Sequence, residues 1–331
     1  MKTQSPSRTA QKFSKSAILL IVSAVALCAS PTIALADSCI GEADWYVTSG
    51  SWFVGSNWNG GVVPNSGTRA QISNGGTATI GSTGAVSCDL TMPASATQSG
   101  RLVVDHGSLT ITFDAAVGGS GRGVLTITNG GTVTAASATI AATSGSVGTV
   151  GVDGGSFTTL GGGISVGGDG GSAGGTGLLT VTNGGTVTAV SVYVWKSGTV
   201  TGNGTVSTTN GPTTIEGTLE PSSGTLTIGG NLTFITSGSN SPLMLSNVVP
   251  ASADNVYVSG GAASLTGRLK VRMTGTFTAG MTYTLLHCDG ALTGSFSSVS
   301  INYPTNQCFT PVITYDYVGN NVYLYLQANC E

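Results

Sequence analysis

Two segments of the chain, residues 123–135 (GVLTITNGGTVTA) and 177–189 (GLLTVTNGGTVTA), are near copies of each other. They are identical at 11 of 13 positions, and both differences exchange one aliphatic residue for another. A diverged copy, TVGVDGGSFTTL at 149–160, lies between them, so the units begin at about 123, 148 and 177. A unit that recurs every 25 to 29 residues within one chain indicates a stacked repeat architecture.

The alternation of residue types inside each unit predicts a strand with one buried and one exposed face. Leu125 and Ile127 alternate with threonines, and successive side chains of a strand point to opposite sides of the backbone. Asn129, Asp153 and Asn183, each followed by two glycines, are predicted to be equivalent corners. Asn, Asp and Gly tolerate the left-handed backbone that a tight corner requires.

Two all-β folds fit this alternation. An antiparallel sandwich or barrel also uses alternating strands and glycine turns, but it does not require one segment to recur at a fixed interval. A parallel β-helix does, because each coil stacks its aliphatic residues on those of the next coil, about 4.8 Å away. We therefore predict an all-β fold with a right-handed parallel β-helix (solenoid) over residues 66–235.

The segments that flank the predicted helix differ from it in composition. Residues 37–65 contain three of the four tryptophans, and residues 236–331 are richer in Tyr and Phe. A solenoid has two open ends whose unpaired backbone groups would recruit other chains. We expect 37–65 to form an N-terminal aromatic cap and 236–331 a C-terminal β cap. Core packing is the expected role of Trp45, Trp52 and Trp58, with carbohydrate stacking as the alternative.

Residues 1–36 are typical of a signal peptide. Four basic residues between positions 2 and 15 precede an apolar stretch at 17–27, and Ala-Leu-Ala at 34–36 fits the cleavage rule. Cleavage is predicted between Ala36 and Asp37. A membrane-spanning helix needs about 20 apolar residues, so the stretch is too short to be an anchor. We expect a secreted or cell-surface protein with no integral membrane segment in the mature chain.

The mature chain is acidic. Removing the four basic residues of the leader from the 11 in the chain leaves seven, against 14 acidic residues. Arg268, Lys270 and Arg272 are the one basic group, and their spacing places them on the outer face of one strand. Nucleic acid is not an expected partner, because phosphates are neutralised by basic residues gathered on one surface.

Five cysteines follow the leader: Cys39, Cys88, Cys288, Cys308 and Cys330. Exported proteins fold in an oxidising compartment, and the pairs nearest in sequence are Cys39–Cys88 and Cys288–Cys308. Cys330 is left over, which leaves another pairing or an intermolecular bond open. The chain has no Cys-x-x-Cys motif and no Cys/His cluster, so we expect no metal site and no cofactor.

Several motifs resemble those of autotransporter-type passenger domains. The opening resembles theirs in Ser51-Trp52, in Asn57-Trp58 and in the GGVVPNSG at 60–67, and the near copies resemble their internal repeats. The segments 217–234, 254–256, 276–286 and 292–296 resemble their last coils. The resemblance covers most of the mature chain and implies a secreted or surface-displayed β-helix, commonly an adhesin or a structural surface protein.

The chain departs from that family at its end. It reaches Glu331 four residues after the segment NVYLYLQ (321–327), so we expect this chain to lack the C-terminal translocator of that family. We therefore expect release, or capture by a separate outer-membrane translocator. Host-surface or envelope glycans or proteins are the expected binding partners.

Few residues could support catalysis. His106 follows Asp105 and His287 precedes Cys288, and because adjacent strand residues face opposite ways, neither pair is expected to act as an acid and base. Four aspartates lie in the repeat region, namely Asp105, Asp114, Asp153 and Asp169. Turn chemistry accounts for Asp153, and Asp169 lies in a glycine-rich loop expected to be flexible.

These observations favour a non-enzymatic, exported β-helix with a role in adhesion or in the cell envelope, without catalytic, cofactor or metal-binding residues. The alternative is a β-helix polysaccharide lyase or glycoside hydrolase, which would gather acidic residues from successive coils into one groove. Glycosidases need two carboxyl groups at a defined separation, and the sequence indicates no such pair.

Overall fold

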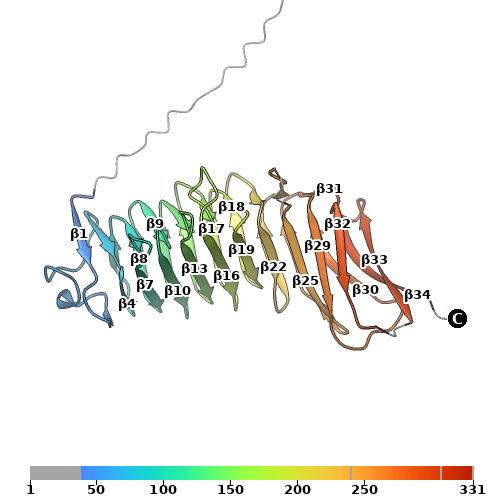
Figure 1. The fold of residues 1–331 in the computed structure, drawn as a ribbon, viewed down its shortest axis with the longest axis horizontal. Coiled ribbons are helices and arrows are strands. Elements are labelled where there is room, and N and C mark those ends of the chain that lie inside the picture. The colour runs from blue at the N-terminus through green and yellow to red at the C-terminus, as the bar shows by residue number, and fades with distance from the viewer. Residues whose placement is uncertain (1–38, 239–240, 306–307, 330–331) are drawn as a thin grey trace, which may run out of the picture. The chain divides into compact units, whose positions relative to one another are not determined.

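The chain forms three long, parallel β-sheets (Figure 1). The computed structural model describes residues 39–238, 241–305 and 308–329, all within one compact unit, Asp37–Glu331. The predicted signal peptide, 1–36, and its cleavage site at Ala36 and Asp37 lie outside the described residues. Apart from one 3-10 turn, η1 (Gly55–Asn57), every helix or strand element of the described chain is a strand.

We name each sheet after its first strand in the chain, and its strands follow in spatial order. The β1 sheet contains β1 (Gly41–Asp44), β3 (Thr68–Gln71), β6 (Leu90–Met92), β9 (Asp114–Val117), β12 (Ser137–Ile140), β15 (Ile164–Val166), β18 (Val192–Val194), β21 (Thr213–Ile215), β24 (Leu232–Phe234), β28 (Ala263–Leu265) and β31 (Leu292–Gly294). The β2 sheet contains β2 (Ser49–Ser51), β4 (Asn74–Ile80), β7 (Ser99–Asp105), β10 (Arg122–Thr128), β13 (Val147–Asp153), β16 (Thr176–Thr182), β19 (Gly198–Gly202), β22 (Thr218–Pro221), β25 (Leu243–Val249), β29 (Arg268–Met273) and β32 (Ser298–Asn302), with β26 (Ser252–Ala253) paired to β25. The β5 sheet contains β5 (Ala85–Ser87), β8 (Ser108–Ile111), β11 (Thr132–Ala135), β14 (Ser156–Thr159), β17 (Thr186–Ala189), β20 (Thr205–Thr208), β23 (Thr225–Gly229), β27 (Asn255–Ser259), β30 (Thr282–Cys288), β34 (Asn321–Ala328) and β33 (Phe309–Asp316).

One coil of the chain contributes a strand to the β2 sheet, then to the β5 sheet, then to the β1 sheet. The two near copies occupy the coils β10–β12 and β16–β18, and the diverged copy, β13–β15, lies between them. Gly123 pairs in register with Gly148, which pairs with Gly177. These pairings confirm the predicted repeat starts and the predicted fold, a parallel β-solenoid.

The interior is built from the aliphatic residues of the repeat. Leu125, Val150 and Leu179 stack in register and are fully buried, whereas the threonine after Leu125 and the one after Leu179 are partly exposed. Fully burying one such aliphatic side chain contributes about 1.5 to 3 kcal/mol before the entropy of ordering the chain is subtracted. Stacking the same residue type in each coil therefore drives the parallel register.

A column of glycines marks the place where each coil returns to the β2 sheet. Gly123, Gly148, Gly177 and Gly198 are paired in register along four neighbouring strands. A Cβ atom at Gly148 would lie 2.3 Å from the carbonyl oxygen of Val117, the last residue of β9. This close approach of two backbones explains why glycine recurs at this position of the repeat.

The predicted equivalence of Asp153 with Asn129 and Asn183 is wrong by one residue. The register pairs Asp153 with Thr128, the last residue of β10. The left-handed backbone falls on Gly154 (φ 65°) in this coil and on the two asparagines (φ 52°) in its neighbours. The reason is that this coil has one residue fewer between its first two strands, so that Asp153 still belongs to a strand.

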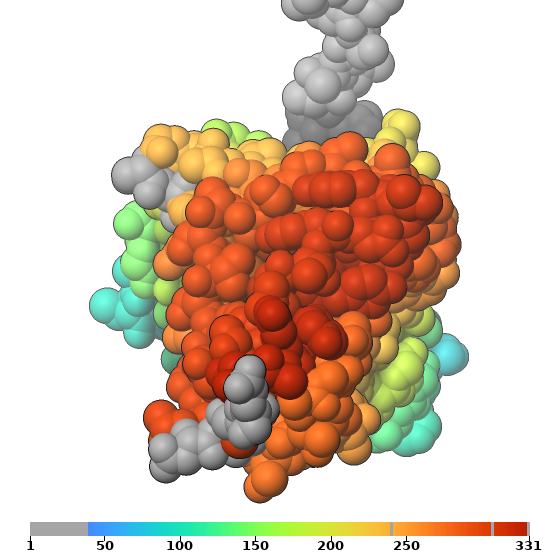
Figure 2. Space-filling view, turned by 90° about the vertical axis from the view of Figure 1, so that its right-hand side faces the viewer, coloured from blue at the N-terminus to red at the C-terminus, as the bar shows by residue number. Residues whose placement is uncertain are grey.

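The parallel stack extends past both predicted boundaries, 66 and 235. At the N-terminal end, β1 and β2 within 37–65 pair in parallel with β3 and β4. At the other end, the stack continues through β31 and β32, within 236–331. Three strands of this region depart from it: β26 pairs antiparallel with β25, and β34 pairs antiparallel with both β30 and β33. In the space-filling view of Figure 2, the orange and red atoms of this region form most of the surface that faces the viewer at this end of the stack.

The three N-terminal tryptophans are part of the core. Trp45, Trp52 and Trp58 are at most 2% exposed, and the ring of Trp58 meets the other two edge-on at centroid distances of 4.9 and 4.7 Å. The indole N–H of Trp58 donates to the carbonyl oxygen of Trp52 at 2.7 Å. Packing is confirmed as their role, since a buried ring has no face to offer a sugar.

One predicted disulfide is present and the other is not. Cys39 and Cys88 are bonded and join the first coils. Cys288 instead carries a free, buried thiol, so the predicted Cys288–Cys308 pair is wrong. Cys308 is itself disulfide-bonded, and Cys330 lies outside the described residues. Sequence proximity misled because Cys288 is the last residue of β30 and faces the core.

The basic triplet lies as predicted on the outer face of one strand. Arg268, Lys270 and Arg272 alternate along β29 with Leu269 and Val271, which are buried. No helix of the described chain has the length and apolar character needed to cross a bilayer.

Candidate functional site

The structure brings Asp105 and His106 together, against the sequence prediction. Nδ1 of His106 lies 2.7 Å from Oδ1 of Asp105. The prediction was wrong because His106 follows the end of β7 and has a left-handed backbone (φ 57°), which removes the strand alternation. Both side chains are exposed, His106 at 70% and Asp105 at 42%. A hydrogen bond from Asn129, assisted by His106, lowers the pKa of Asp105, so the carboxylate is a poor proton acceptor.

Asp153 and Asp114 serve contacts between neighbouring coils. Asp153 accepts hydrogen bonds from Asn183 Nδ2 and, at 3.1 Å, from the hydroxyl of Thr182. Asp114 accepts one from the hydroxyl of Ser137 in the next coil. Both carboxylates therefore accept hydrogen bonds from the next coil. Their role is structural, because these bonds join neighbouring coils.

His287 and Cys288 face opposite sides of β30, as predicted. Cys288 is fully buried, whereas the His287 side chain is 43% exposed and its Nδ1 lies 3.0 Å from Oδ1 of Asn321. Burial raises the pKa of the Cys288 thiol, which disfavours the thiolate that nucleophilic catalysis requires. The pair therefore has neither the orientation nor the ionisation for catalysis.

A metal-like cluster occurs at the N-terminal end of the stack. Ligand atoms of Cys39, Cys88 and Asp89 lie within 4.8 Å of one another. Because the two cysteines are joined in a disulfide, neither can supply the thiolate that zinc or a similar ion binds. The cluster is a disulfide beside a carboxylate.

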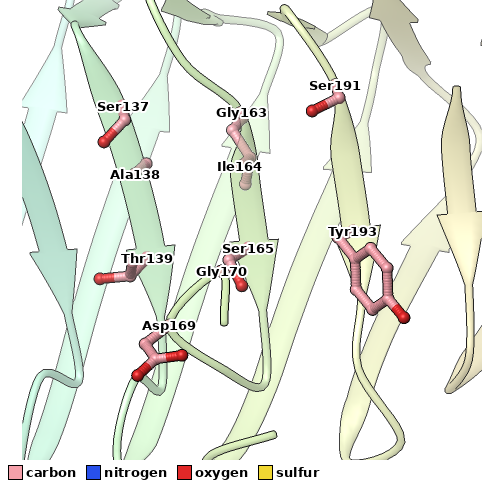
Figure 3. Close-up of a pocket in the computed structure, with 10 residues that line it drawn as sticks. All are labelled: Ser137, Ala138, Thr139, Gly163, Ile164, Ser165, Asp169, Gly170, Ser191 and Tyr193. Carbon is pink, nitrogen blue, oxygen red and sulfur yellow. The ribbon is translucent and has the colours of Figure 1, made fainter. Parts of the chain in front are cut away.

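A groove crosses the outer face of the β1 sheet. It has a volume of about 330 Å³ and spans three neighbouring strands, β12, β15 and β18 (Figure 3). We refer to it as the β12–β18 groove. The residues that line it are Ser137, Ala138, Thr139, Gly163, Ile164, Ser165, Asp169, Gly170, Ser191 and Tyr193. It combines hydroxyl groups, one aromatic ring and one carboxylate.

The carboxylate comes from the loop at residues 167–175, in which hydrogen bonds and a β-bridge hold Asp169 in position. Oδ1 of Asp169 accepts hydrogen bonds from the backbone N–H groups of Gly171 (3.0 Å) and Ser172 (2.7 Å) and from the Ser172 hydroxyl (3.2 Å). Gly168 and Ala173 form an antiparallel bridge across the base of the loop. The backbone bonds lower the pKa of Asp169, and Oδ2 receives no hydrogen bond from the described chain.

An aromatic pair supports the other side of the groove. Tyr193 and Trp195 are two residues apart at β18 and pack with a centroid distance of 4.3 Å. The indole N–H of Trp195 donates to the hydroxyl of Ser165 at 2.8 Å, which fixes the ring against β15. A Cβ atom at Gly168 would lie 2.3 Å from Cδ1 of Trp195, so the loop rests directly on this ring. Partial burial, with the charge of Glu216, raises the pKa of Tyr193.

Sequence reasoning did not single out Tyr193 or Trp195. The usable signal is the segment SVYVWK at 191–196, where two aromatic residues stand at alternate positions and Tyr193 is in register with Ser165 of the preceding coil. Such spacing places both rings on the outer face of one strand. Asp169 was identified as a candidate, but its position beside these rings depends on the path of the loop.

No protein-family model matches the chain, and no curated protein sequence matches it.

Proposed function

We propose that the protein is an exported, non-enzymatic surface protein that acts in adhesion or as a structural component of the cell envelope. The observation that carries the proposal is the threonine-rich outer face of the repeated coils. Along β11 and β17, for example, threonines face outward while Val133 and Val187 are buried. A rigid stack with uncharged outward residues suits many weak contacts, which become strong when copies are displayed together.

The expected partners are host-surface or envelope glycans or proteins. A fusion of residues 1–36 to a reporter that is active only outside the cytoplasm tests export. We expect reporter activity, and we expect it to disappear when the apolar residues 17–27 are interrupted by charge. An inactive reporter, with the fusion protein retained in the cytoplasm, would contradict export.

Bead attachment tests adhesion. Beads coated with the mature protein should bind envelope or host-surface preparations more strongly as the coating density rises, because avidity grows with the number of simultaneous contacts. Beads coated with an unrelated acidic protein are the control. Attachment no greater than that control at every density would contradict the adhesive role.

A glycoside hydrolase or polysaccharide lyase is the second candidate, favoured by a groove that is lined by both the carboxylate of Asp169 and the ring of Tyr193. Glycoside hydrolysis generally uses two carboxyl groups across the scissile bond, and Asp169 is the only carboxylate among the described residues that line the groove. Incubation of the mature protein with neutral and acidic polysaccharides tests this candidate. We expect no new reducing ends or unsaturated products; turnover that is lost in Asp169→Asn or Asp153→Asn would establish the enzyme instead.

A further inference from the structure

The β12–β18 groove has the dimensions of a small-ligand site. Its volume, about 330 Å³, lies at the lower end of the range typical of ligand pockets. It crosses three parallel strands, and two steps of a parallel ladder cover roughly 9.6 Å at about 4.8 Å per step. The groove is therefore elongated along the stacking direction, which suits a short linear ligand.

The lining supplies two kinds of contact. Tyr193 offers a ring that its neighbour Trp195 holds in place. Hydroxyl groups of Ser137, Thr139 and Ser191 line the same groove, and their side chains are drawn in Figure 3. A ligand that fits such a surface has an apolar face for the ring and many hydroxyl groups for the polar atoms.

The charge of the lining excludes some ligands. The hydrogen bonds to Oδ1 keep the Asp169 carboxylate ionised near neutral pH, and no cationic side chain is among the described lining residues. An anionic sugar would meet an unpaired negative charge. A quaternary ammonium ion is bound by several aromatic faces, whereas one ring lines this groove.

We propose that the β12–β18 groove binds a neutral saccharide, with the ring of Tyr193 against the apolar face of a pyranose and Oδ2 of Asp169 accepting hydrogen bonds from its hydroxyl groups. The proposal rests on the proposed function, because it assigns the groove to attachment rather than to turnover. Trp195 and Gly168 are positioning residues, since Trp195 holds both Tyr193 and the loop that carries Asp169.

The test uses the mature chain and an array of neutral glucose, mannose, galactose and xylose oligosaccharides, with oligogalacturonate, sialylated glycans and choline on the same array. Neutral oligosaccharides that bind are then titrated by calorimetry. We expect Tyr193→Ala to weaken binding at least about tenfold, because it removes the stacking face. Asp169→Asn should also weaken binding, by about tenfold or more, since a hydrogen bond to a charged group is lost.

Matched variants separate binding from folding. Tyr325→Ala removes another outward tyrosine, on β34 of a different sheet, and should leave affinity unchanged. Tyr193→Phe keeps the ring and should retain most of the affinity, so it decides the question if Tyr193→Ala fails to fold. Failure of every neutral oligosaccharide to bind, selective binding of choline or of an anionic glycan, or equal affinity in wild type and Tyr193→Ala would overturn the proposal.

Bead attachment distinguishes this proposal from the function on which it rests. Beads that attach equally well with wild type and Tyr193→Ala, when no neutral saccharide binds, would overturn the saccharide site and leave adhesion standing. Saccharide binding in solution without bead attachment would overturn adhesion and leave the site standing. Cleavage of the bound oligosaccharide would overturn both.

Discussion

A Cβ atom placed on Gly148 would lie 2.3 Å from the carbonyl oxygen of Val117, the last residue of β9. Gly151, three residues later on the same strand, has open space around its Cβ position. A side chain therefore fits at Gly151 but not at Gly148, because only Gly148 lies close to the backbone of another coil.

Gly148→Ala is expected to destabilise the protein by about 1 to 3 kcal/mol, the usual cost of forcing an extra methyl group into a packed site. Gly151→Ala is the matched control and should be neutral or stabilising by up to about 1 kcal/mol, because it restricts the unfolded chain without a clash. Urea denaturation followed by circular dichroism measures both. Equal stability of the two variants would contradict the register of the stack.

The Cys39–Cys88 disulfide should stabilise the N-terminal end of the stack. The cysteines are 49 residues apart, and a loop of this length corresponds to a contribution of up to about 4 kcal/mol in the chain-entropy model. Replacing both by serine should lower the midpoint of unfolding, while reductant should have a smaller effect on that variant than on the wild type. No change in the midpoint would show that the bond does not constrain the chain.

Cys288 should remain a thiol in the folded protein. It is fully buried, and burial raises its pKa, so an alkylating reagent should modify it only after denaturation. Peptide mapping without reduction, after alkylation under denaturing conditions, should recover alkylated Cys288 and the Cys39–Cys88 cross-link. Recovery of a Cys288–Cys308 cross-link would restore the pairing that sequence proximity suggested.

The loop that carries Asp169 should loosen in acid. The pKa of Asp169 is lowered in the folded state, chiefly by hydrogen bonds from the backbone N–H groups of Gly171 and Ser172. As pH falls, the Asp169 carboxylate is therefore protonated in the unfolded chain before it is protonated in the folded chain. The stabilisation is therefore complete above the usual aspartate pKa and is lost as pH falls through the lowered value. A carboxyl-carbon NMR titration should place Asp169 below an ordinary aspartate. A midpoint at or above the ordinary value would contradict the hydrogen bonds described.

The regular part of the fold could be predicted from the sequence. Leu125 and Leu179 occur in near-identical segments. When a segment recurs in successive coils, its buried side chains occupy equivalent positions and stack along the solenoid. The diverged copy followed the same rule in its strands, where Val150 pairs with both leucines. Alternation also correctly placed Cys288 and His287 on opposite faces.

Features that depend on single residues could not be predicted in this way. A corner shortened by one residue moved Asp153 back into its strand, and a left-handed backbone turned His106 towards Asp105. The β12–β18 groove depends on the loop 167–175 resting on Trp195, a contact between segments that the repeat does not contain. Such contacts are set by tertiary packing, not by local pattern.

Distances between spin labels along the β2 sheet test the central claim, that the coils stack in parallel and in register. A label at Arg101 is paired in turn with one at Thr199, Thr218 or Arg268, in a Cys288→Ala background; these outward positions follow one another in the ladder. Four, five and seven steps at about 4.8 Å predict distances of roughly 19, 24 and 34 Å, rising with the number of steps. Distances that do not rise in this order, as in two facing antiparallel layers, would contradict the solenoid and the groove on its surface.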